Sequence, residues 1–281
     1  MNKANILIIG VIYNTHQEAL RYLESIEIPE DIDFTLVLAD NSDQSPPAGF
    51  LEKIKDHTFV QYFWTGKNLG YFGGAREGMK YYFRNKTDYP KWILVTNVDI
   101  VFTPDFFHRL VVWNDNQNIG VIAPAIISKK WSADYNPKIP VRYSIRKILF
   151  YKFLYSSFIL HNLFLILAYF KRWLNGVKKR ENSAIENRKG KKGKIYAPHG
   201  SCFIFKNTYF ILGGTLDLPN FLFGEEIFVG ETAARLGLEV IYDPEMIIYD
   251  HEHASVGFFV TPAINNYYRE SIRAILELYY H

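Results

Sequence analysis

The first half of the chain alternates apolar runs with mixed, amphipathic stretches. The apolar runs have the length of strands and lie at 6–13, 35–39, 59–64 and 92–96. They are nearly continuous, as in strands that are buried on both faces of a sheet. The stretches between them predict three helices. These lie at 17–26, from just after Gly74 to about 83, and at 104–113. Strands and helices in this alternation predict an α/β fold, with a mostly parallel sheet flanked by helices.

This alternation breaks off after about residue 142 and resumes at Ile195. A strand is predicted for the string IYAPHGSCFIF that begins at Ile195. The remaining predicted elements are a helix at 224–236, short strands at 239–242 and 246–249, and a C-terminal helix at 263–280. The pattern therefore predicts one domain over 1–281, in which the segment 141–194 is an inserted, apolar and basic helical segment.

Residues 148–170 of the insertion are almost wholly apolar or aromatic. The stretch is long enough to cross a bilayer as a helix. However, His161 and Asn162 would then lie near the bilayer centre, where polar groups are costly. Three alternatives stay open: a spanning helix, one or two helices lying in the membrane interface, and a core or dimer helix. The flanking basic and aromatic residues favour interfacial helices.

The positive charge of the chain is concentrated in the same region. Between Lys129 and Lys194 there are 17 Lys and Arg residues and three acidic residues, in a chain whose formal net charge is +3. A basic block in an otherwise acidic protein indicates one anionic partner at one place. Because the block also holds the most apolar segment, the expected partner is an anionic membrane surface and not nucleic acid.

Composition narrows the class of protein further. Hydrophobic residues make up 48% and charged residues 22% of the chain, which allows a large core and argues against disorder. The single cysteine, Cys202, excludes an internal disulfide, which fits a reducing compartment. The apolar N-terminal run is short and no small-residue cleavage site follows it. We therefore interpret it as a buried strand and not as a signal peptide.

Polar residues follow the predicted strands at their carboxyl ends, where parallel sheets bind their ligands. Asn14, Asp40 and Asp99 come after the first, second and fourth strands. A glycine-rich string, Asn68–Gly74, precedes a predicted helix, and such glycines allow close approach of a pyrophosphate to a helix N-terminus. Its spacing differs from a dinucleotide-binding fingerprint. These positions indicate a ligand site at one edge of the sheet.

Five strings, in this order, resemble the motifs of family 2 glycosyltransferases, which have the GT-A fold. They span nearly the whole chain and are Val11–Asn14, Ala39–Ser42, Asn68–Gly74, Thr96–Asp99 and Phe223–Glu226. The resemblance is to the rhamnosyltransferase-like type that builds bacterial surface polysaccharides such as O-antigen. It implies a GT-A, Rossmann-like mixed sheet, with a nucleotide-sugar-binding half at 1–127 and an acceptor-side half with the C-terminal helix at 195–281.

The resemblance implies that the first four strings bind a nucleotide diphosphate sugar. Asp40 would accept a hydrogen bond from the imide N–H of a uracil- or thymine-type base. A turn or capping residue is the alternative interpretation of Asp40. The implied donor-binding residues are Tyr13, Asn14, Asp40, Asn41, Asn68, Gly70, Gly73, Gly74, Arg76, Asn97 and Asp99.

A divalent metal cofactor, Mg²⁺ or Mn²⁺, is also implied by the resemblance. Thr96–Asp99 is similar to a degenerate D-x-D motif in which Asn97 replaces the first acid. The metal would bridge the two phosphates of the donor and offset the charge on the leaving group. The implied metal ligands are Asp99, His251 and His253. For Asp99, a turn residue at the end of a strand is the alternative, and for the two histidines, a place on a surface loop.

The fifth string resembles the G-E-D motif that carries the catalytic base. Glu226 aligns with the usual aspartate and would take the proton of the acceptor hydroxyl, with Glu225 as the other candidate. Acids favoured by the helix dipole in a first turn are the structural alternative. Where the family often has an acid and an arginine further on, this chain has Phe228 and Thr232. The residues implied to bind the acceptor are His199, Gly200 and Ser201.

The expected function is inverting transfer of a sugar to a lipid-linked glycan in cell-surface polysaccharide synthesis. The expected location is cytoplasmic and peripheral, on the inner face of the plasma membrane. A sugar nucleotidyltransferase is one alternative, but the glycine-rich loop with Arg and Lys that it normally carries does not follow the first strand. A non-catalytic membrane-binding module with a degenerate transferase fold is another, but it would have lost Glu226 or Asp99, and both are present.

Overall fold

Ten strands of the described residues form one sheet. The computed structural model describes residues 5–30, 32–113, 118–128, 133–180, 190–251 and 259–280, with 171–180 as helix backbone only. The strands are β1 (Asn5–Ile12), β2 (Asp33–Asp40), β3 (Val60–Trp64), β4 (Trp92–Asn97), β5 (Ile100–Phe102), β6 (Ile119–Ser128), β7 (Ala133–Asp134), β8 (Gly193–Ile195), β9 (Cys202–Lys206) and β10 (Glu239–Asp250).

The sheet is mixed and mostly parallel. Its order is β3-β2-β1-β4-β9-β6-β10-β5, and β7 and β8 pair with β6 and β10 beside this path. Strands β3, β2, β1, β4, β6 and β10 point the same way, whereas β9 and β5 are antiparallel to their neighbours. The α/β fold class with a mostly parallel sheet, predicted from the alternation of apolar runs, is confirmed.

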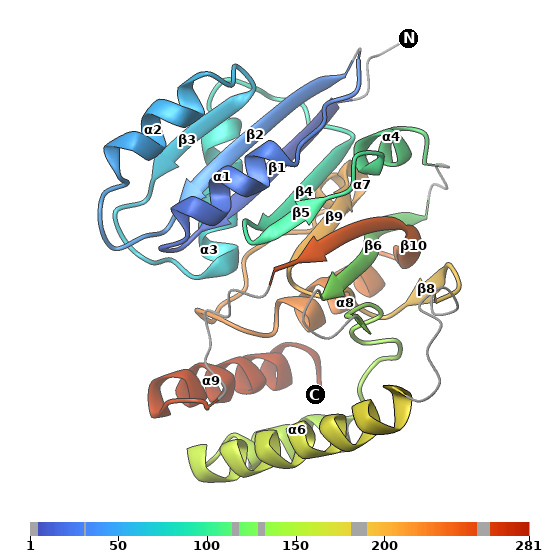
Figure 1. Ribbon diagram of the computed structural model, residues 1–281. Helices are drawn as coiled ribbons and strands as arrows, with labels where there is room; N and C mark the ends of the chain where they lie inside the picture. Colours follow the sequence, from blue (N-terminus) through green and yellow to red (C-terminus); the bar gives the residue numbers. More distant parts are fainter. Residues whose placement is uncertain are drawn as a thin grey trace.

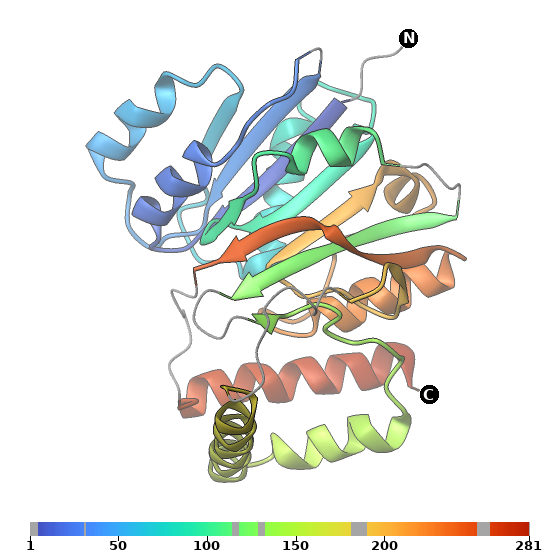
Figure 2. The ribbon, with the colours of Figure 1, turned by 45° about the vertical axis from the view of Figure 1, so that its right-hand side comes forward.

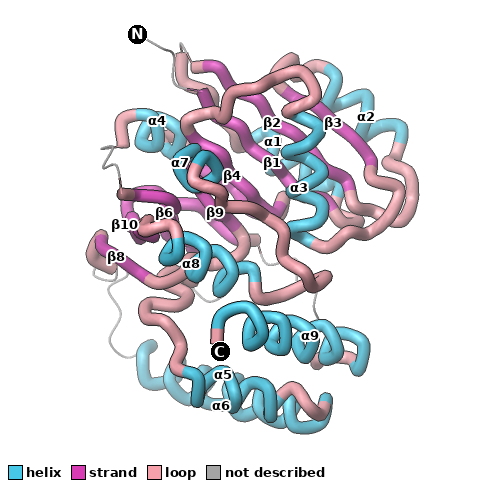
Figure 3. The backbone as a smooth tube through the Cα atoms, turned by 180° about the vertical axis from the view of Figure 1, so that it is seen from behind, coloured by secondary structure: helices cyan, strands magenta, loops and turns pink. Residues whose placement is uncertain are grey.

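Helices cover both faces of this sheet. They are α1 (His16–Glu24), α2 (Ala48–Lys55), α3 (Tyr71–Tyr82), α4 (Phe106–Val111), α5 (Ile145–Leu154), α6 (Phe158–Arg180), α7 (Asn207–Ile211), α8 (Glu225–Arg235) and α9 (Pro262–Tyr279). Helices α1, α2 and α4 pack on one face (Figure 1), and α3, α7 and α8 pack on the other (Figure 3). Helices α5, α6 and α9 lie together at one end of the molecule.

The central strand β1 explains why its sequence is continuously apolar. Ile6 and Ile8 join the core beneath α1, α2 and α4, whereas Leu7 and Ile9 join the core beneath α3, α7 and α8. Successive side chains of a strand point to opposite faces, so both sets must be apolar when both faces are covered. The interpretation of the N-terminal run as a strand buried on both faces is confirmed.

The carboxyl ends of β1, β2 and β4 meet at one edge of the sheet. Ile12 of β1 is the register partner of Asp40 in β2, and Val11 is the partner of Asn97 in β4. The backbone N–H of Asn41 donates to the carbonyl of Ile12 at 2.8 Å. The polar residues that follow these three strands are therefore brought together, as their positions in the sequence predicted.

The predictions for β6 and β10 were wrong. No strand was predicted at 119–128, and β10 was predicted as two short strands. Pro124 of β6 lies opposite Asp243 of β10, and the register shifts between Asp243 and Ile247. A proline has no N–H for the ladder, and β10 carries Pro244 at the same point. The ladder is therefore interrupted here, and β10 continues past a bulge instead of ending.

Other elements also differ from the prediction. The string that begins at Ile195 is not one strand: β8 ends at Ile195 and β9 begins at Cys202, with a loop between them. Helix α3 already begins at Tyr71, so the later glycines of the glycine-rich string are helical. Helix α2 was not predicted, because it is only 8 residues long and follows a proline-rich turn.

The apolar part of the insertion folds as two helices and not as one. Helix α5 and the part of α6 up to Phe170 are bent by 112° relative to each other. Among the described residues no single helix is long and apolar enough to cross a membrane, and only this bent pair meets the criterion together. Figure 2 shows both helices beneath α9. Of the three alternatives left open, a straight spanning helix over 148–170 is not what the chain forms.

We predict that Gly70→Ala destabilises the protein. Gly70 has a φ of +74°, and a Cβ there would lie 1.9 Å from the carbonyl oxygen of Phe221. We expect the free energy of unfolding to fall by about 2 kcal/mol or more. The control is Gly49→Ala in α2, where a Cβ meets no atom within 4 Å. Chemical denaturation of both variants is the measurement, and equal stabilities would contradict the packing described here.

Candidate active site

A cavity of about 560 Å³ opens at the carboxyl edge of the sheet, between the first and second halves of the chain. Most of the site residues predicted from the sequence line it. From the first half these are Tyr13, Asn41, Asn68, Gly70, Asn97 and Asp99, and from the second half His199, Gly200, Ser201 and Glu225. No Lys or Arg is among the described residues that line the cavity.

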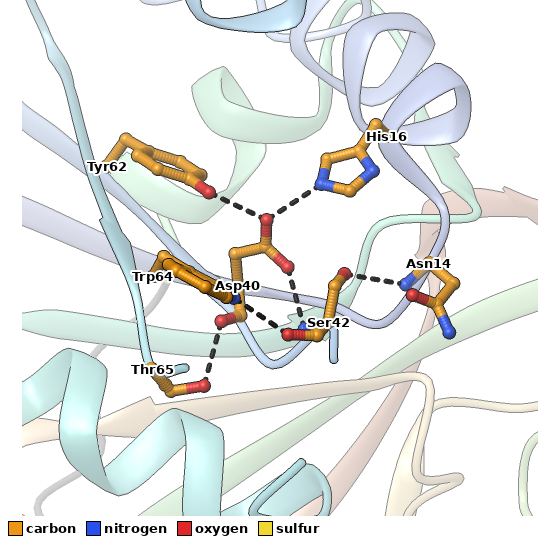
Figure 4. A network of polar contacts seen from close by, with 7 residues as sticks. All are labelled: Asn14, His16, Asp40, Ser42, Tyr62, Trp64 and Thr65. Atoms are coloured by element: carbon orange, nitrogen blue, oxygen red, sulfur yellow. Dashed lines mark hydrogen bonds and ion pairs between the residues drawn. The ribbon is translucent and has the colours of Figure 1, made fainter. Parts of the chain in front are cut away.

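Asp40 does not line this cavity, because its side chain is fully buried in a network of hydrogen bonds (Figure 4). Its Oδ2 lies 2.7 Å from Nε2 of His16 and accepts from the hydroxyl of Tyr62, also at 2.7 Å. Its Oδ1 accepts from the N–H of Ser42 at 2.9 Å. The carboxylate thus joins the ends of β2 and β3 to the start of α1. This arrangement fits the alternative interpretation of Asp40 as a turn residue.

Asn41 faces the cavity where the resemblance placed Asp40. Its Nδ2 donates to the carbonyl of Gly70 at 2.8 Å. Its Oδ1 is buried and has no hydrogen-bond partner among the described residues. A buried amide oxygen without a donor is costly, so this atom is a candidate acceptor for a ligand N–H or O–H.

The two residues at the end of β1 differ in what they do. Tyr13 lines the cavity, and its hydroxyl donates to Asp43 at 3.0 Å. Asn14 has a positive φ of 55°, and its backbone N–H donates to Oγ of Ser42 at 2.8 Å. Figure 4 shows Asn14 beside the Asp40 network. Asn14 therefore shapes the turn after β1 and does not line the cavity.

The glycine-rich string packs against protein groups. Asn68 accepts from the N–H of Gly70 at 2.9 Å, and both residues line the cavity. Beyond them, Gly73 faces Leu69 and Gly74 faces the side chain of Asn41, and neither lines the cavity. Close packing within the protein therefore accounts for these two later glycines.

Arg76 also lies away from the cavity. Its guanidinium donates to Asp217 at 3.1 Å, across the boundary between the two halves of the chain. The structure thus gives Arg76 a partner within the protein, where the resemblance implied the donor.

Asp99 is the strongest candidate for a cation ligand. Its Oδ1 is buried and has no hydrogen-bond partner among the described residues. Burial, and then the nearby charge of Asp250, raise the pKa of Asp99 to about 7. A carboxylate that is out of water and beside a second carboxylate is stabilised by a cation.

Asp99 and its neighbours fit a divalent cation that is bound partly by the protein and partly by a diphosphate. His251 is held next to Asp99, because the backbone N–H of His251 donates to the backbone carbonyl of Asp99 at 3.1 Å. The side chain of His251 does not line the main cavity. His253 lies outside the described residues. No group of three His, Cys, Asp or Glu side chains in the described part of the chain is close enough to hold an ion alone. The remaining ligands would then be phosphate oxygens and water.

The loop before β9 forms another part of the wall. Burial, and then the charge of Lys138, lower the pKa of His199 to about 3, so the imidazole is neutral. Its Nδ1 accepts from the N–H of Ser201 at 3.2 Å, which leaves the proton on Nε2. The hydroxyl of Ser201 donates to Asp250 at 3.2 Å. This loop therefore lines the cavity with a neutral histidine and is hydrogen-bonded to Asp250, the acid near Asp99.

Glu225 and Glu226 begin α8 but lie in different surroundings. Glu225 is buried and lines the cavity. Burial, and then the charge of Glu226, raise the pKa of Glu225 to about 8. Glu226 is half-buried, and a Cβ on Gly200 would lie 3.3 Å from its Oε1. Burial, and then the Glu226 charge, raise the pKa of Tyr268 on α9 to about 12. Glu226 thus lies between the cavity wall and α9.

Several residues that line the cavity were not predicted from the sequence. The loop before α8 contributes Phe221, Leu222 and Phe223, and α9 contributes Ile264 and Tyr267. An aromatic loop before the motif glycine was the one available signal for the first group. For α9 there was none, since a helix periodicity does not tell which face meets a cavity. Phe228, where the family has an acid, is a core residue that contacts Phe72 edge to face.

No protein-family model matches this sequence, and no curated protein matches it either. Solved structures do match. The structure of GalNAc-T7 with UDP, GalNAc and Mn²⁺ has a TM-score of 0.58 at 13% identity, over 99% of this chain and 49% of that chain. The chain thus spans about half the length of that structure.

A second match is the mannosyltransferase PcManGT from Pyrobaculum calidifontis in complex with GDP-Man and Mn²⁺. Its TM-score is 0.50 at 12% identity, over 98% of this chain and 74% of that chain. Both similarities extend over nearly the whole of the present chain. They show that this chain has the GT-A fold of glycosyltransferases.

Proposed function

We propose that this protein is a metal-dependent glycosyltransferase that takes a sugar from a nucleotide diphosphate sugar. One observation carries the proposal: a single cavity brings the unpartnered carboxylate oxygen of Asp99 together with the buried carboxyl of Glu225. The cavity lies where parallel sheets bind ligands, and the chain has the fold of enzymes that act on nucleotide sugars.

The donor would occupy the part of the cavity beside β1, β2 and β4. The buried Oδ1 of Asn41 would accept from the base or ribose, and Asn68 and Gly70 would line the diphosphate. Because no Lys or Arg lines the described cavity, a cation is needed to offset the diphosphate charge. Asp99, with His251 beside it, would hold that cation. When bound, it would stabilise the negative charge that develops on the departing nucleotide diphosphate.

Glu226 is the proposed general base. The acceptor hydroxyl oxygen would attack the anomeric carbon, the bond from that carbon to the diphosphate oxygen would break, and the hydroxyl proton would pass to Glu226. Attack opposite the leaving group inverts the anomeric centre. The pKa of Glu225, which burial and then the charge of Glu226 raise to about 8, supports this choice, because a carboxyl that holds its own proton at neutral pH cannot take the proton of the acceptor.

The acceptor would approach past Gly200 and α9. Glu226 lies between Gly200 and Tyr268, and Tyr267 of the same helix lines the cavity. Aromatic side chains suit the apolar faces of sugars. We propose a lipid-linked glycan as acceptor, in cell-surface polysaccharide synthesis of the rhamnosyltransferase-like kind on the cytoplasmic face of the membrane. The exposed apolar side chains of the helical insertion, whose helices contact α9, support a lipid-borne substrate.

Asp99→Asn should abolish metal-dependent nucleotide binding. The amide removes the negative charge that attracts the cation but keeps the size of the side chain. Thermal shift with UDP, TDP and GDP, each with and without Mn²⁺, is the measurement. We expect the wild type to be stabilised by one nucleotide with Mn²⁺, and Asp99→Asn not to be. Asp105→Asn, at an exposed position, is the control. A full shift in Asp99→Asn, or full activity of the wild type in EDTA, would contradict the assignment.

Glu226→Gln should retain donor binding while turnover falls by about 10²–10⁴-fold, because the amide cannot accept the acceptor proton. Single-turnover transfer and nucleotide binding are measured on the same preparation. If Glu225→Gln shows this pattern and Glu226→Gln does not, the base is Glu225. If neither substitution slows turnover, the motif does not carry the base.

Glu225→Gln should raise stability at alkaline pH. The native pKa of Glu225 is raised from 4.5 to about 8, so the unfolded chain releases its proton earlier. This residue therefore lowers stability increasingly as the pH rises from about 4.5 to about 8. The glutamine removes that penalty, so we expect a Tm increase of about 3 °C or more at pH 8 and little change at pH 4.5. A pH-independent change would show that Glu225 is ionised in the folded protein.

A further inference from the structure

The outer surface of the helical insertion is apolar, although it is exposed. Residues of α5 and α6 point large side chains away from the protein, among them Phe153 at 66%, Ile159 at 65% and Leu167 at 59% exposure. We define the docking face as Leu149, Phe150, Phe153, Ile159, Leu163 and Leu167. Contiguous apolar patches of this kind on a protein surface mark binding sites for proteins or membranes.

Two uncharged polar residues near the start of α6, His161 and Asn162, point inward. His161 is buried, and its Nδ1 lies 2.9 Å from Oδ1 of Asn265 in α9. Asn162 bonds to the backbone of Val260 in both directions, at 2.9 Å through Nδ2 and at 2.8 Å through Oδ1. Asn265 also donates to the carbonyl of Tyr155 at 3.0 Å. These contacts fix which side of α6 faces α9, and they turn the apolar side outward.

The charged residues of the segment that carries the docking face are of one sign. Arg146 and Lys152 of α5 are exposed, and no Asp or Glu occurs between Asp134 and Glu181. A second copy placed by a two-fold axis would bring these basic residues together with no acid of the segment to pair with them. An anionic lipid surface would pair with them and would also bury the apolar side chains.

We propose that the docking face inserts shallowly into an anionic lipid bilayer, with Arg146 and Lys152 at the headgroups. Helix α9 joins this contact to the cavity, since Asn265 holds α6 while Ile264 and Tyr267 line the cavity wall. Docking thus places the cavity entrance next to the lipid surface. The membrane contact stands on the geometry of α5 and α6, and it rests on the proposed function only in that the acceptor is lipid-borne.

The test is flotation of the full chain with vesicles of phosphatidylcholine alone or mixed equally with phosphatidylglycerol. We expect strong binding to the mixed vesicles and weak binding to the neutral ones. High salt should release part of the protein, and alkaline carbonate all of it, because shallow apolar burial adds to a screened electrostatic attraction. Binding that ignores lipid charge, or that survives carbonate, would overturn the proposal.

Two sets of variants separate the apolar and electrostatic contributions. Phe153→Asp with Leu167→Asp should lower binding to the mixed vesicles by about tenfold or more. Ile211→Asp, at a position 61% exposed on the distant helix α7, should leave binding unchanged. Arg146→Gln with Lys152→Gln should lower binding to the mixed vesicles by about tenfold and leave the weak binding to neutral vesicles unchanged.

Two further measurements keep the outcome unambiguous. Light scattering determines the oligomeric state: a dimer that Phe153→Asp with Leu167→Asp converts to monomers would assign the face to a second copy and overturn the proposal. Nucleotide binding with Mn²⁺ in the same variants shows that the cavity is intact. Vesicle binding without any nucleotide binding would refute the proposed function but not the docking face, and the reverse result would refute only the docking face.

Discussion

The antiparallel pairing of β9 with β4 is the constraint on which the site depends. Thr96, just before the Asn97–Asp99 turn, is the register partner of Cys202. Because β9 runs against the other central strands, its N-terminal loop reaches the edge where β1, β2 and β4 end. The carbonyl of Ser201 accepts from the N–H of Asn97 at 3.0 Å and fastens the loop there. One backbone ladder thus places residues a hundred positions apart in the sequence on the walls of one cavity.

Burial in the cavity opposes the ionisation of the carboxyl groups that line it. Burial raises the pKa values of Asp99 and Glu225 to about 7 and about 8, with Asp250 and Glu226 adding repulsion. No Lys or Arg lines the described cavity to relieve this. Such a site lowers the stability of the free protein and favours ligands that bring a cation and a hydroxyl, as expected where a binding site is selected for its chemistry. By contrast, Asp40 receives donors from three residues and serves the architecture.

In the insertion, apolar and polar side chains are distributed in the opposite way from the rest of the fold. Elsewhere apolar side chains point inward, as in β1 with its two buried sets. In α5 and α6, the buried polar residue His161 and the half-buried Asn162 face the protein, and aliphatic and aromatic residues face outward. Helices α5, α6 and α9 pack against one another in this part of the molecule. Helix α9 also contributes residues to the cavity wall. In the proposed function, substrate entry and membrane contact would therefore depend on the same helix.

The sequence by itself determined the fold class, the edge of the sheet where the cavity opens, and the acids Asp99 and Glu225 that line it. The reason is that burial on both faces requires continuous apolar strands, and that parallel strands end together. It also indicated the membrane-like composition of 148–170. The tertiary structure decided the rest. Pro124 and Pro244 bend β10 where two strands were expected, since the ladder tolerates them only at a bulge. Asn41 and not Asp40 faces the cavity, and Tyr267 of α9 joins it. Which side of a residue meets solvent, ligand or protein is set by contacts between distant segments, and a local pattern does not contain those contacts.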